Sequence, residues 1–242
     1  MIPETNEPIV RRKLSDEVFD RLKAMIVSGE CGPGDTLPSE RELMVRFGVG
    51  RPAIREAMQA LANLGLVTIS HGELARVRQL TAESAMRQLD PVAQLLLSTS
   101  PESLEHLKEA RSFFERGMVR RAAEVATEAD VADLRAILAR QTALAGDAPA
   151  FMSADMQLHN RIAQITGNPI YLAVSEMMLG WLQEYHENML IWRGHGDQTL
   201  AEHAEVIDCI AAHDPDGAER ALTRHLSRSN HLYAHHEAGA GS

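Results

Sequence analysis

Two short helical patterns separated by a tight turn occupy residues 38–65 and restrict what this chain can fold into. Ser39 and Glu42 have the spacing of a capping box, which indicates that a helix begins after Ser39. The second pattern follows a two-residue turn, carries Pro52 in its first turn and ends at Gly65. Two helices this short and this closely joined predict a helix-turn-helix.

The flanking segments complete a larger unit around these two helices. Residues 14–27 carry apolar side chains at three- and four-residue spacing, which predicts a preceding helix. Residues 66–70 and 74–77 are rich in β-branched side chains and flank a glycine-containing turn, which predicts a hairpin. Three helices and a hairpin predict a winged helix-turn-helix domain over residues 1–80.

The rest of the chain has no strand pattern. Amphipathic segments follow one another from residue 81 to about residue 236, and breaks that contain proline or glycine divide them into six or seven helices. We therefore expect a mainly α fold, in which an all-α helical bundle over residues 81–236 follows the winged domain. Residues 237–242 are expected to form a flexible tail.

Charge permits a nucleic-acid partner. The net charge is −10, but residues 1–80 hold 11 basic and 11 acidic side chains, so the acidic excess lies in the C-terminal part. A neutral first third can still contact phosphates through arginines at helix starts. No apolar run approaches the roughly 18 to 20 residues of a membrane span, and the first residues lack the apolar stretch of a signal peptide. We expect a cytoplasmic protein without a membrane partner, in which Cys31 and Cys209 are packing residues.

The arginines of the helix-turn-helix are the candidate DNA contacts. Arg51 and Arg55 lie four residues apart at the start of its second helix and share one face, from which arginine can bond to guanine O6 and N7 in a major groove. Arg41, at the start of the first helix, is suited to a phosphate contact. His71 and Gly72 form the tip of the wing, where glycine lets the backbone approach a groove. The alternative is that these arginines only solvate the surface.

A candidate metal site combines residues from several predicted helices. Asp155 and His159 are four residues apart in a helical segment and share one face. His203 and His225 lie in later helices among apolar neighbours, which favours inward-facing side chains. One carboxylate and three imidazoles suit zinc, nickel, copper or manganese, and an open coordination position would accept a ligand. The alternative from spacing alone is that these are ordinary solvated or core histidines.

The segment TLPSERELMVRFGVGRPAIREAMQALANLGLV resembles the DNA-binding domain of the GntR family of bacterial regulators, in which a SERELA-like helix precedes an R-x-x-x-R helix and a wing. Pro52 stands where the family more often has threonine or serine, so the operator sequence is less predictable than DNA binding itself. The resemblance implies DNA contacts at Arg41, Arg51, Arg55, His71 and Gly72.

Residues from about 84 to 233 resemble the FCD effector domain, the all-helical domain that defines the FadR subfamily of this family. In that subfamily a D-x-x-x-H pair and two later histidines commonly bind metal. The segment LKEARSFFERGMVRRAA resembles the first long effector helix and implies that Arg111 pairs with an acidic ligand. The alternative for this arginine is an ordinary salt bridge with Glu115. The resemblance places the metal ligands at Asp155, His159, His203 and His225.

Within the subfamily the resemblance is strongest to regulators of sialic-acid catabolism, through segments such as FFERGMVRRAAE and HDPDGAERALTRHL. It implies a homodimeric, metal-assisted repressor that binds double-stranded operator DNA and senses a small organic acid, with sialic acid as the leading effector and zinc as the leading metal. We expect no enzymatic activity. Two alternatives stay open: a metal sensor without an organic effector, and a metal-dependent hydrolase, for which no general-base motif is evident.

Several aromatic residues and histidines have less definite roles. Trp181, Tyr185 and Trp192 are candidates for lining an effector cavity, although aromatic residues at helical spacing are more often core or interface residues. Three further histidines are expected at the surface: His231, His235 and His236.

Overall fold

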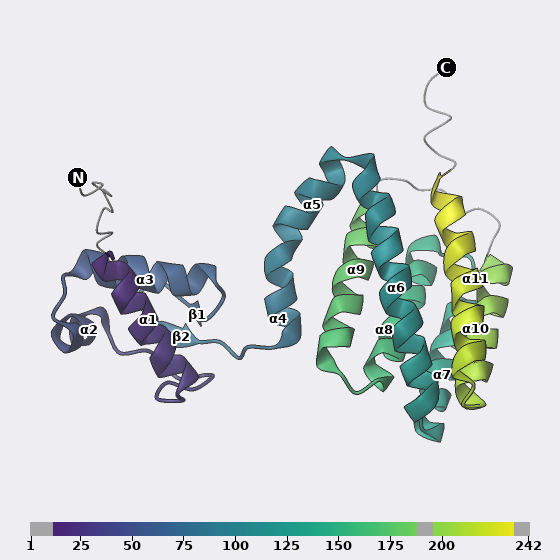
Figure 1. The fold of residues 1–242 in the computed structure, drawn as a ribbon, viewed down its shortest axis with the longest axis horizontal. Coiled ribbons are helices and arrows are strands. Elements are labelled where there is room, and N and C mark those ends of the chain that lie inside the picture. Colours follow the sequence, from purple (N-terminus) through teal and green to yellow (C-terminus); the bar gives the residue numbers. More distant parts are fainter. Residues whose placement is uncertain (1–11, 188–195, 235–242) are drawn as a thin grey trace, which may run out of the picture. The chain divides into compact units, whose positions relative to one another are not determined.

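The computed structural model describes residues 12–187 and 196–234, and the chain divides into two compact units, Met1–Gln88 and Leu89–Ser242 (Figure 1). The mainly α fold expected from the sequence is confirmed, since the two strands of the described residues are only two residues long each. Within the described ranges, no helix has both the length and the apolar character needed to cross a membrane. The expected tail, residues 237–242, lies outside the described residues.

The N-terminal unit is built from three main helices and a hairpin. The capping box predicted for its second helix forms, because the Ser39 hydroxyl accepts from the Glu42 amide at 3.3 Å and the Glu42 carboxylate accepts from the Ser39 amide at 2.8 Å. Gly48 ends this helix at φ 66°, a conformation that favours glycine. The elements are α1 (Leu14–Val27), α2 (Glu40–Phe47), α3 (Arg51–Asn63), β1 (Val67–Thr68), β2 (Arg76–Val77), α4 (Ala82–Met86) and the 3-10 turn η1 (Arg87–Leu89).

One apolar core holds the helices and hairpin of this unit together. Leu22 of α1, Leu43 of α2 and Ile54 of α3 are fully buried in it, and α1 packs directly on α3. Each such side chain contributes about 1.5–3 kcal/mol to folding. In the hairpin β1 pairs antiparallel with β2, so that Val67 lies opposite Val77. The core therefore orients α3 so that its polar face stays exposed.

The C-terminal unit is a bundle of seven described helices. With α4, the described residues contain eight α-helices after residue 81, rather than six or seven. The difference arises at Ala126 and Thr127, because this break contains neither proline nor glycine and Thr127 instead caps the following helix through a capping box with Asp130. The helices are α5 (Asp90–Thr99), α6 (Pro101–Val125), α7 (Glu128–Ala143), α8 (Ala148–Ile165), α9 (Pro169–Glu187), α10 (Gly196–Ala211) and α11 (Pro215–Ala234).

Five of these helices share a single core. In the bundle α6 packs along α11, and α11 packs on α10 (Figure 1). Because each helix places at least one side chain in the same cluster, burial of that cluster sets the rotation of every helix about its axis. Fully buried members from α6, α7, α8, α10 and α11 are Val119, Leu134, Leu158, Val206 and Leu222.

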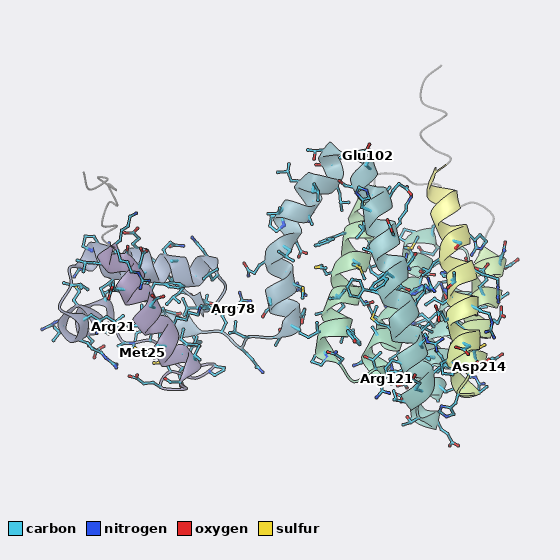
Figure 2. The ribbon with its side chains drawn as sticks, viewed as in Figure 1. Arg21, Met25, Arg78, Glu102, Arg121 and Asp214 are labelled. Carbon is cyan, nitrogen blue, oxygen red and sulfur yellow. The ribbon has the colours of Figure 1, made fainter. Side chains whose placement is uncertain are left out.

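The last helix of the bundle begins at a well-defined cap. Asp214 lies at the N-terminal end of α11 (Figure 2), and its Oδ1 accepts from the Gly217 amide at 2.9 Å. A Cβ atom on Gly217 would lie 2.8 Å from Asp214 Cγ and clash with this carboxylate. The close approach of the capping residue therefore favours glycine here.

Candidate functional site

Four polar side chains converge in the interior of the bundle. Asp155 and His159 come from α8, His203 from α10 and His225 from α11, and one possible ligand atom of each lies within 4.8 Å of the others. The exposed fraction is 8% for Asp155 and no more than 3% for the three histidines. The structure therefore brings together the four residues on which the sequence predicted a metal site.

Helix periodicity explains why these polar side chains point inward. His203 precedes the core residue Val206 by three positions, and His225 follows Leu222 by three. Residues three or four apart share a helix face, so packing of the apolar residue turns the histidine into the bundle as well. The cluster is thus a polar extension of the apolar core, aligned by the same helix rotations.

Each imidazole is held by a hydrogen bond at its Nδ1 atom. His159 Nδ1 lies 2.6 Å from Glu115 Oε2 of α6, and His225 Nδ1 lies 2.9 Å from Glu202 Oε2 of α10. A carboxylate can only accept, so both Nδ1 atoms carry the hydrogen. Both Nε2 atoms then present lone pairs to the centre of the cluster.

The third imidazole is held by an amide. His203 Nδ1 lies 2.9 Å from Gln141 Oε1 of α7, and Gln141 Nε2 donates to Asp155 Oδ1 at 3.1 Å. Because the Asp155 carboxylate requires a donor, the amide nitrogen must face it and the amide oxygen must face His203. His203 is therefore protonated at Nδ1, and its Nε2 also presents a lone pair.

These tautomers make the centre of the cluster a set of acceptors. The Nε2 atoms of His203 and His225 are 3.4 Å apart, and Asp155 Oδ1 lies 3.4 Å from His203 Nε2. Lone pairs that face each other in a buried site repel unless a positive group lies between them. Neutral imidazoles with Nδ1 bound to a carboxylate or carbonyl are the usual form of histidine metal ligands. The four candidate ligands, together with the carboxylates and the amide that hold the histidine Nδ1 atoms, therefore fit a divalent cation.

The electrostatics of the cluster favour neutral imidazoles at His203 and His225 and ionised carboxylates beside them, so these imidazoles need not lose a proton when a metal binds. Burial lowers the pKa of His203 to about 3 and also lowers the pKa of His225, because a buried imidazolium loses hydration. Burial by itself would raise the pKa of Glu202, but hydrogen bonds from its imidazole and guanidinium partners lower it to about 2. For Glu115, burial acts in the same opposing way but is outweighed by Arg111 and His159 together, so that its pKa lies below the ordinary range.

Arg111 lies beside this cluster rather than on the surface. Its Nε donates to Glu115 Oε1 at 2.5 Å, and its Nη2 lies 3.4 Å from His159 Nε2. The arginine and glutamate side chains are only 7% and 5% exposed. The ordinary salt bridge considered from the sequence therefore forms, but it is buried and leads directly to a candidate metal ligand.

Reasoning from the sequence missed the residues that hold the three histidines at their Nδ1 atoms. Glu115 was considered only as a partner for Arg111, and Gln141 and Glu202 were not considered at all. Each lies on a different helix from the histidine it supports, with the exposed fraction of Gln141 at 0%. An i, i+3 or i, i+4 pattern cannot reveal such pairs, because they form between helices.

The less definite aromatic and histidine candidates are only partly described. Trp181 packs in an apolar cluster with Leu97 and Met178, and its Nε1 donates to Asp90 Oδ1 of α5 at 2.8 Å. This is the core position considered as an alternative to cavity lining. The remaining candidates lie outside the described part of the chain or have side chains outside it: Tyr185, Trp192, His231, His235 and His236.

The arginines predicted to contact DNA lie at exposed positions of α2 and α3. The side chains of Arg51 and Arg55 are 59% and 65% exposed, and Arg41 is exposed at the start of α2. Both arginines of α3 also approach one carboxylate that the sequence reasoning missed. Glu40 Oε1 accepts from Arg55 Nε at 2.8 Å, and Glu40 Oε2 lies 3.6 Å from Arg51 Nε.

The predicted wing tip lies in the turn between β1 and β2. His71 and Gly72 are exposed there, and Gly72 adopts φ 79°. The positive φ explains the glycine, because it is strained for residues with a Cβ atom. The five candidate DNA residues thus occupy one structural unit, separate from the buried cluster of the bundle.

Comparison with known proteins agrees with this two-part architecture. Residues 14–77 match the family described as bacterial regulatory proteins, gntR family, and residues 106–228 match the FCD domain. A solved structure of Streptococcus agalactiae GntR has a similar fold, with a TM-score of 0.59 at 21% identity over 89% of this chain and 98% of that chain.

Curated relatives match over nearly the whole chain. The HTH-type transcriptional repressor NanR of Edwardsiella tarda is 40% identical over 91% of this chain and 85% of its own length. The protein of the same name from Enterobacter sp. is 38% identical over 97% of this chain and 90% of its own length. These families and relatives are regulators rather than enzymes, which disfavours the hydrolase considered above. The chain is a DNA-binding transcriptional regulator that belongs to the GntR family, with an FCD domain as its C-terminal part.

Proposed function

We propose that this protein is a metal-assisted repressor that binds operator DNA as a homodimer in the cytoplasm and releases it when a small organic acid binds. The observation that carries the proposal is the buried cluster of one carboxylate and three Nε2 lone pairs, with the Arg111 guanidinium beside it. Sialic acid is the leading effector, because the chain is similar over most of its length to repressors named NanR.

The proposed metal is held by four residues: Asp155, His159, His203 and His225. Zinc suits three imidazoles and a carboxylate, and nickel or manganese are the alternatives. When bound, the metal would act as a Lewis acid towards an oxygen ligand such as a carboxylate or hydroxyl. The Nδ1 partners of the histidines would hold the rings in orientation and keep Nε2 available.

Charge in and around the cluster supports an anionic effector. Asp155, Glu115 and Glu202 carry three negative charges, and Arg111 and Arg228, which bind two of these carboxylates, carry two positive charges. A divalent ion changes the balance of these groups from −1 to +1. A buried site with a net positive charge stabilises an acid, and a guanidinium next to it adds charge-assisted hydrogen bonds.

For the acid to act as an inducer, it must bind the DNA-incompetent arrangement more tightly than the DNA-competent one. Such couplings are typically about 1–3 kcal/mol, which corresponds to roughly 5- to 150-fold in operator affinity. A ligand held by Arg111 of α6 and by a metal on α8, α10 and α11 would tie these helices together. That differential contact is the physical source of the proposed coupling.

The test combines calorimetry with an operator mobility shift on zinc-loaded protein. We expect sialic acid to bind and to weaken operator binding, and Arg111→Gln to lower acid affinity by about tenfold or more, the loss expected for a buried charge-assisted contact. Arg121→Gln is the matched control, because Arg121 lies on the same helix with its side chain 52% exposed. Metal content is measured in the same preparations, since Arg111 also binds Glu115.

The remaining outcomes separate the alternatives. If a hexuronate or an aromatic carboxylate binds and sialic acid at millimolar concentration does not, the sialic-acid assignment is wrong and the acid-responsive regulator stands. If no acid binds but a chelator changes operator affinity, the protein is a metal sensor. Equal acid affinity in Arg111→Gln and in the wild type would remove Arg111 from the effector site.

Two features support homodimerisation: the helix-turn-helix and an exposed apolar surface on α6. Helix-turn-helix proteins commonly place two recognition helices in successive major grooves, about 34–36 Å apart. Phe113 and Phe114 of α6 are 76% and 40% exposed and their rings contact each other, so two aromatic side chains lie together on the surface of this unit. Light scattering should give the mass of a dimer, and Phe113→Glu should weaken it. A wild-type protein that stays monomeric at micromolar concentration would contradict this part of the proposal.

A further inference from the structure

We infer that Glu40 is a positioning residue for base recognition, which aligns the guanidinium groups of Arg51 and Arg55 before DNA binds. The inference rests on the proposed base contacts of these two arginines. Glu40 is the first residue of α2 and approaches the Nε atom of both side chains, at 2.8 Å for Arg55 and 3.6 Å for Arg51. One carboxylate of the supporting helix therefore serves two residues of the recognition helix.

The side of the guanidinium that Glu40 contacts is the important detail. Guanine is read by two parallel hydrogen bonds to O6 and N7, and the two terminal nitrogens of arginine can supply them. A carboxylate bound at Nε restricts the plane of the group and leaves the terminal nitrogens available. For Arg55 the contact is a hydrogen bond, and for Arg51 it is a longer ion pair, so Arg55 is the more strongly aligned of the two.

Glu40 also reduces repulsion within the recognition helix. Arg51 and Arg55 lie four residues apart on one face of α3, where like charges destabilise a helix. A negative charge between them favours the two side chains lying close together. The Glu40 side chain is 34% exposed, compared with 59% and 65% for the two arginines, so the arginine side chains remain accessible while the carboxylate is more covered.

A simpler role for Glu40 makes a different prediction. If it only adds a negative charge near the DNA, its removal should strengthen binding to every duplex by the same factor, because phosphate repulsion falls. If it aligns the arginines, its removal should strengthen binding to unrelated DNA while the selected sequence gains less or loses affinity. The ratio of specific to non-specific affinity separates these roles, whereas the specific affinity alone does not.

The experiment uses the full chain and a duplex that the wild-type protein selects from a randomised pool, compared with a scrambled duplex of equal length. We expect Glu40→Gln to lower the affinity ratio about fivefold or more, which is the lower range for one lost bidentate base contact. Glu56→Gln is the matched control, because this exposed α3 residue has the same charge and its ion pair is with Lys13 at 3.9 Å. The control should leave the ratio unchanged.

Further variants separate this inference from the proposed function. In an Arg55→Ala background, Glu40→Gln should lower the ratio much less than it does alone, because the residue acts through Arg55. A ratio within about twofold of the wild type in Glu40→Gln, with Arg51→Ala and Arg55→Ala still impaired, would overturn the positioning role only. If the arginine variants themselves keep full specificity, the assignment of α3 as the base-reading helix is wrong.

Discussion

Gln141 donates to Asp155 and accepts from His203, so its replacement by leucine perturbs two of the four candidate metal ligands at once. The residue is fully buried on α7, and leucine has a similar size without hydrogen-bonding groups. The expected effect is therefore a loss of polar contacts rather than the creation of a cavity. Asp155 Oδ1 loses a donor, and His203 Nδ1 loses the acceptor that determines its tautomer.

The magnitude follows from these two contacts. A buried group left without a partner costs about 1–3 kcal/mol, and two such groups would cost about twice that. However, His203 can transfer its proton to Nε2, which lies 3.4 Å from Asp155 Oδ1 and can then donate to it. We therefore expect Gln141→Leu to lower the free energy of unfolding of the metal-free protein by about 1–3 kcal/mol. A metal must now displace this proton, so zinc affinity should fall roughly 10- to 100-fold.

Two measurements on metal-depleted protein test this expectation: denaturant unfolding, and zinc affinity in competition with a chromophoric chelator. Gln157→Leu is the control, because Gln157 is an exposed residue of α8 that is also hydrogen-bonded. The control should change neither quantity appreciably. A Gln141→Leu protein with wild-type zinc affinity would refute the reasoning, because the orientation of His203 and Asp155 would then not depend on this amide.

Three further predictions concern other parts of the molecule. Arg41→Ala should weaken binding to selected and scrambled duplexes equally and lower the salt slope of binding by about 1, as measured by salt titration; a loss confined to the selected duplex would contradict a phosphate contact. Zinc at 100 times its dissociation constant should stabilise the wild type by about 2.7 kcal/mol in thermal unfolding, and His203→Ala should abolish this shift; its persistence would point to ligands elsewhere. Gly180 lies in α9, where an added Cβ atom would meet open space, so Gly180→Ala should raise the free energy of unfolding by up to about 1 kcal/mol. Gly217→Ala should give no such gain, because it displaces the Asp214 cap. Equal gains in the two variants would contradict this role of the cap.

Local features of the fold could be predicted because the interactions that produce them span only a few residues. The Ser39 and Glu42 capping box forms as expected, since both hydrogen bonds join residues three positions apart. The glycine-containing turn predicted between the hairpin strands also forms, and Gly72 adopts its positive φ within that turn. The number of helices after residue 81 was underestimated, because the break between α6 and α7 at Ala126 and Thr127 contains neither proline nor glycine.

The candidate metal site could be predicted only in part. Asp155 and His159 are joined by helix geometry, but His203 and His225 lie on other helices and required either the family resemblance or the structure. Neither helix geometry nor the family resemblance identified the residues that support the histidines, because Glu115 meets His159 across 44 positions of sequence and Gln141 meets His203 across 62. Spacing along a single helix carries no information about such pairs.

The sequence by itself determined the class of fold, the positions of the helix-turn-helix and the hairpin, and the residue types able to hold a metal, because capping, periodicity and charge act within a few residues of one another. The tertiary structure decided which side chains meet. Packing of apolar residues such as Val206 and Leu222 sets the rotation of α10 and α11, and this rotation turns His203 and His225 towards α8. It likewise decided that Glu40 of α2 meets Arg55 of α3, because that contact exists only once the two helices pack together.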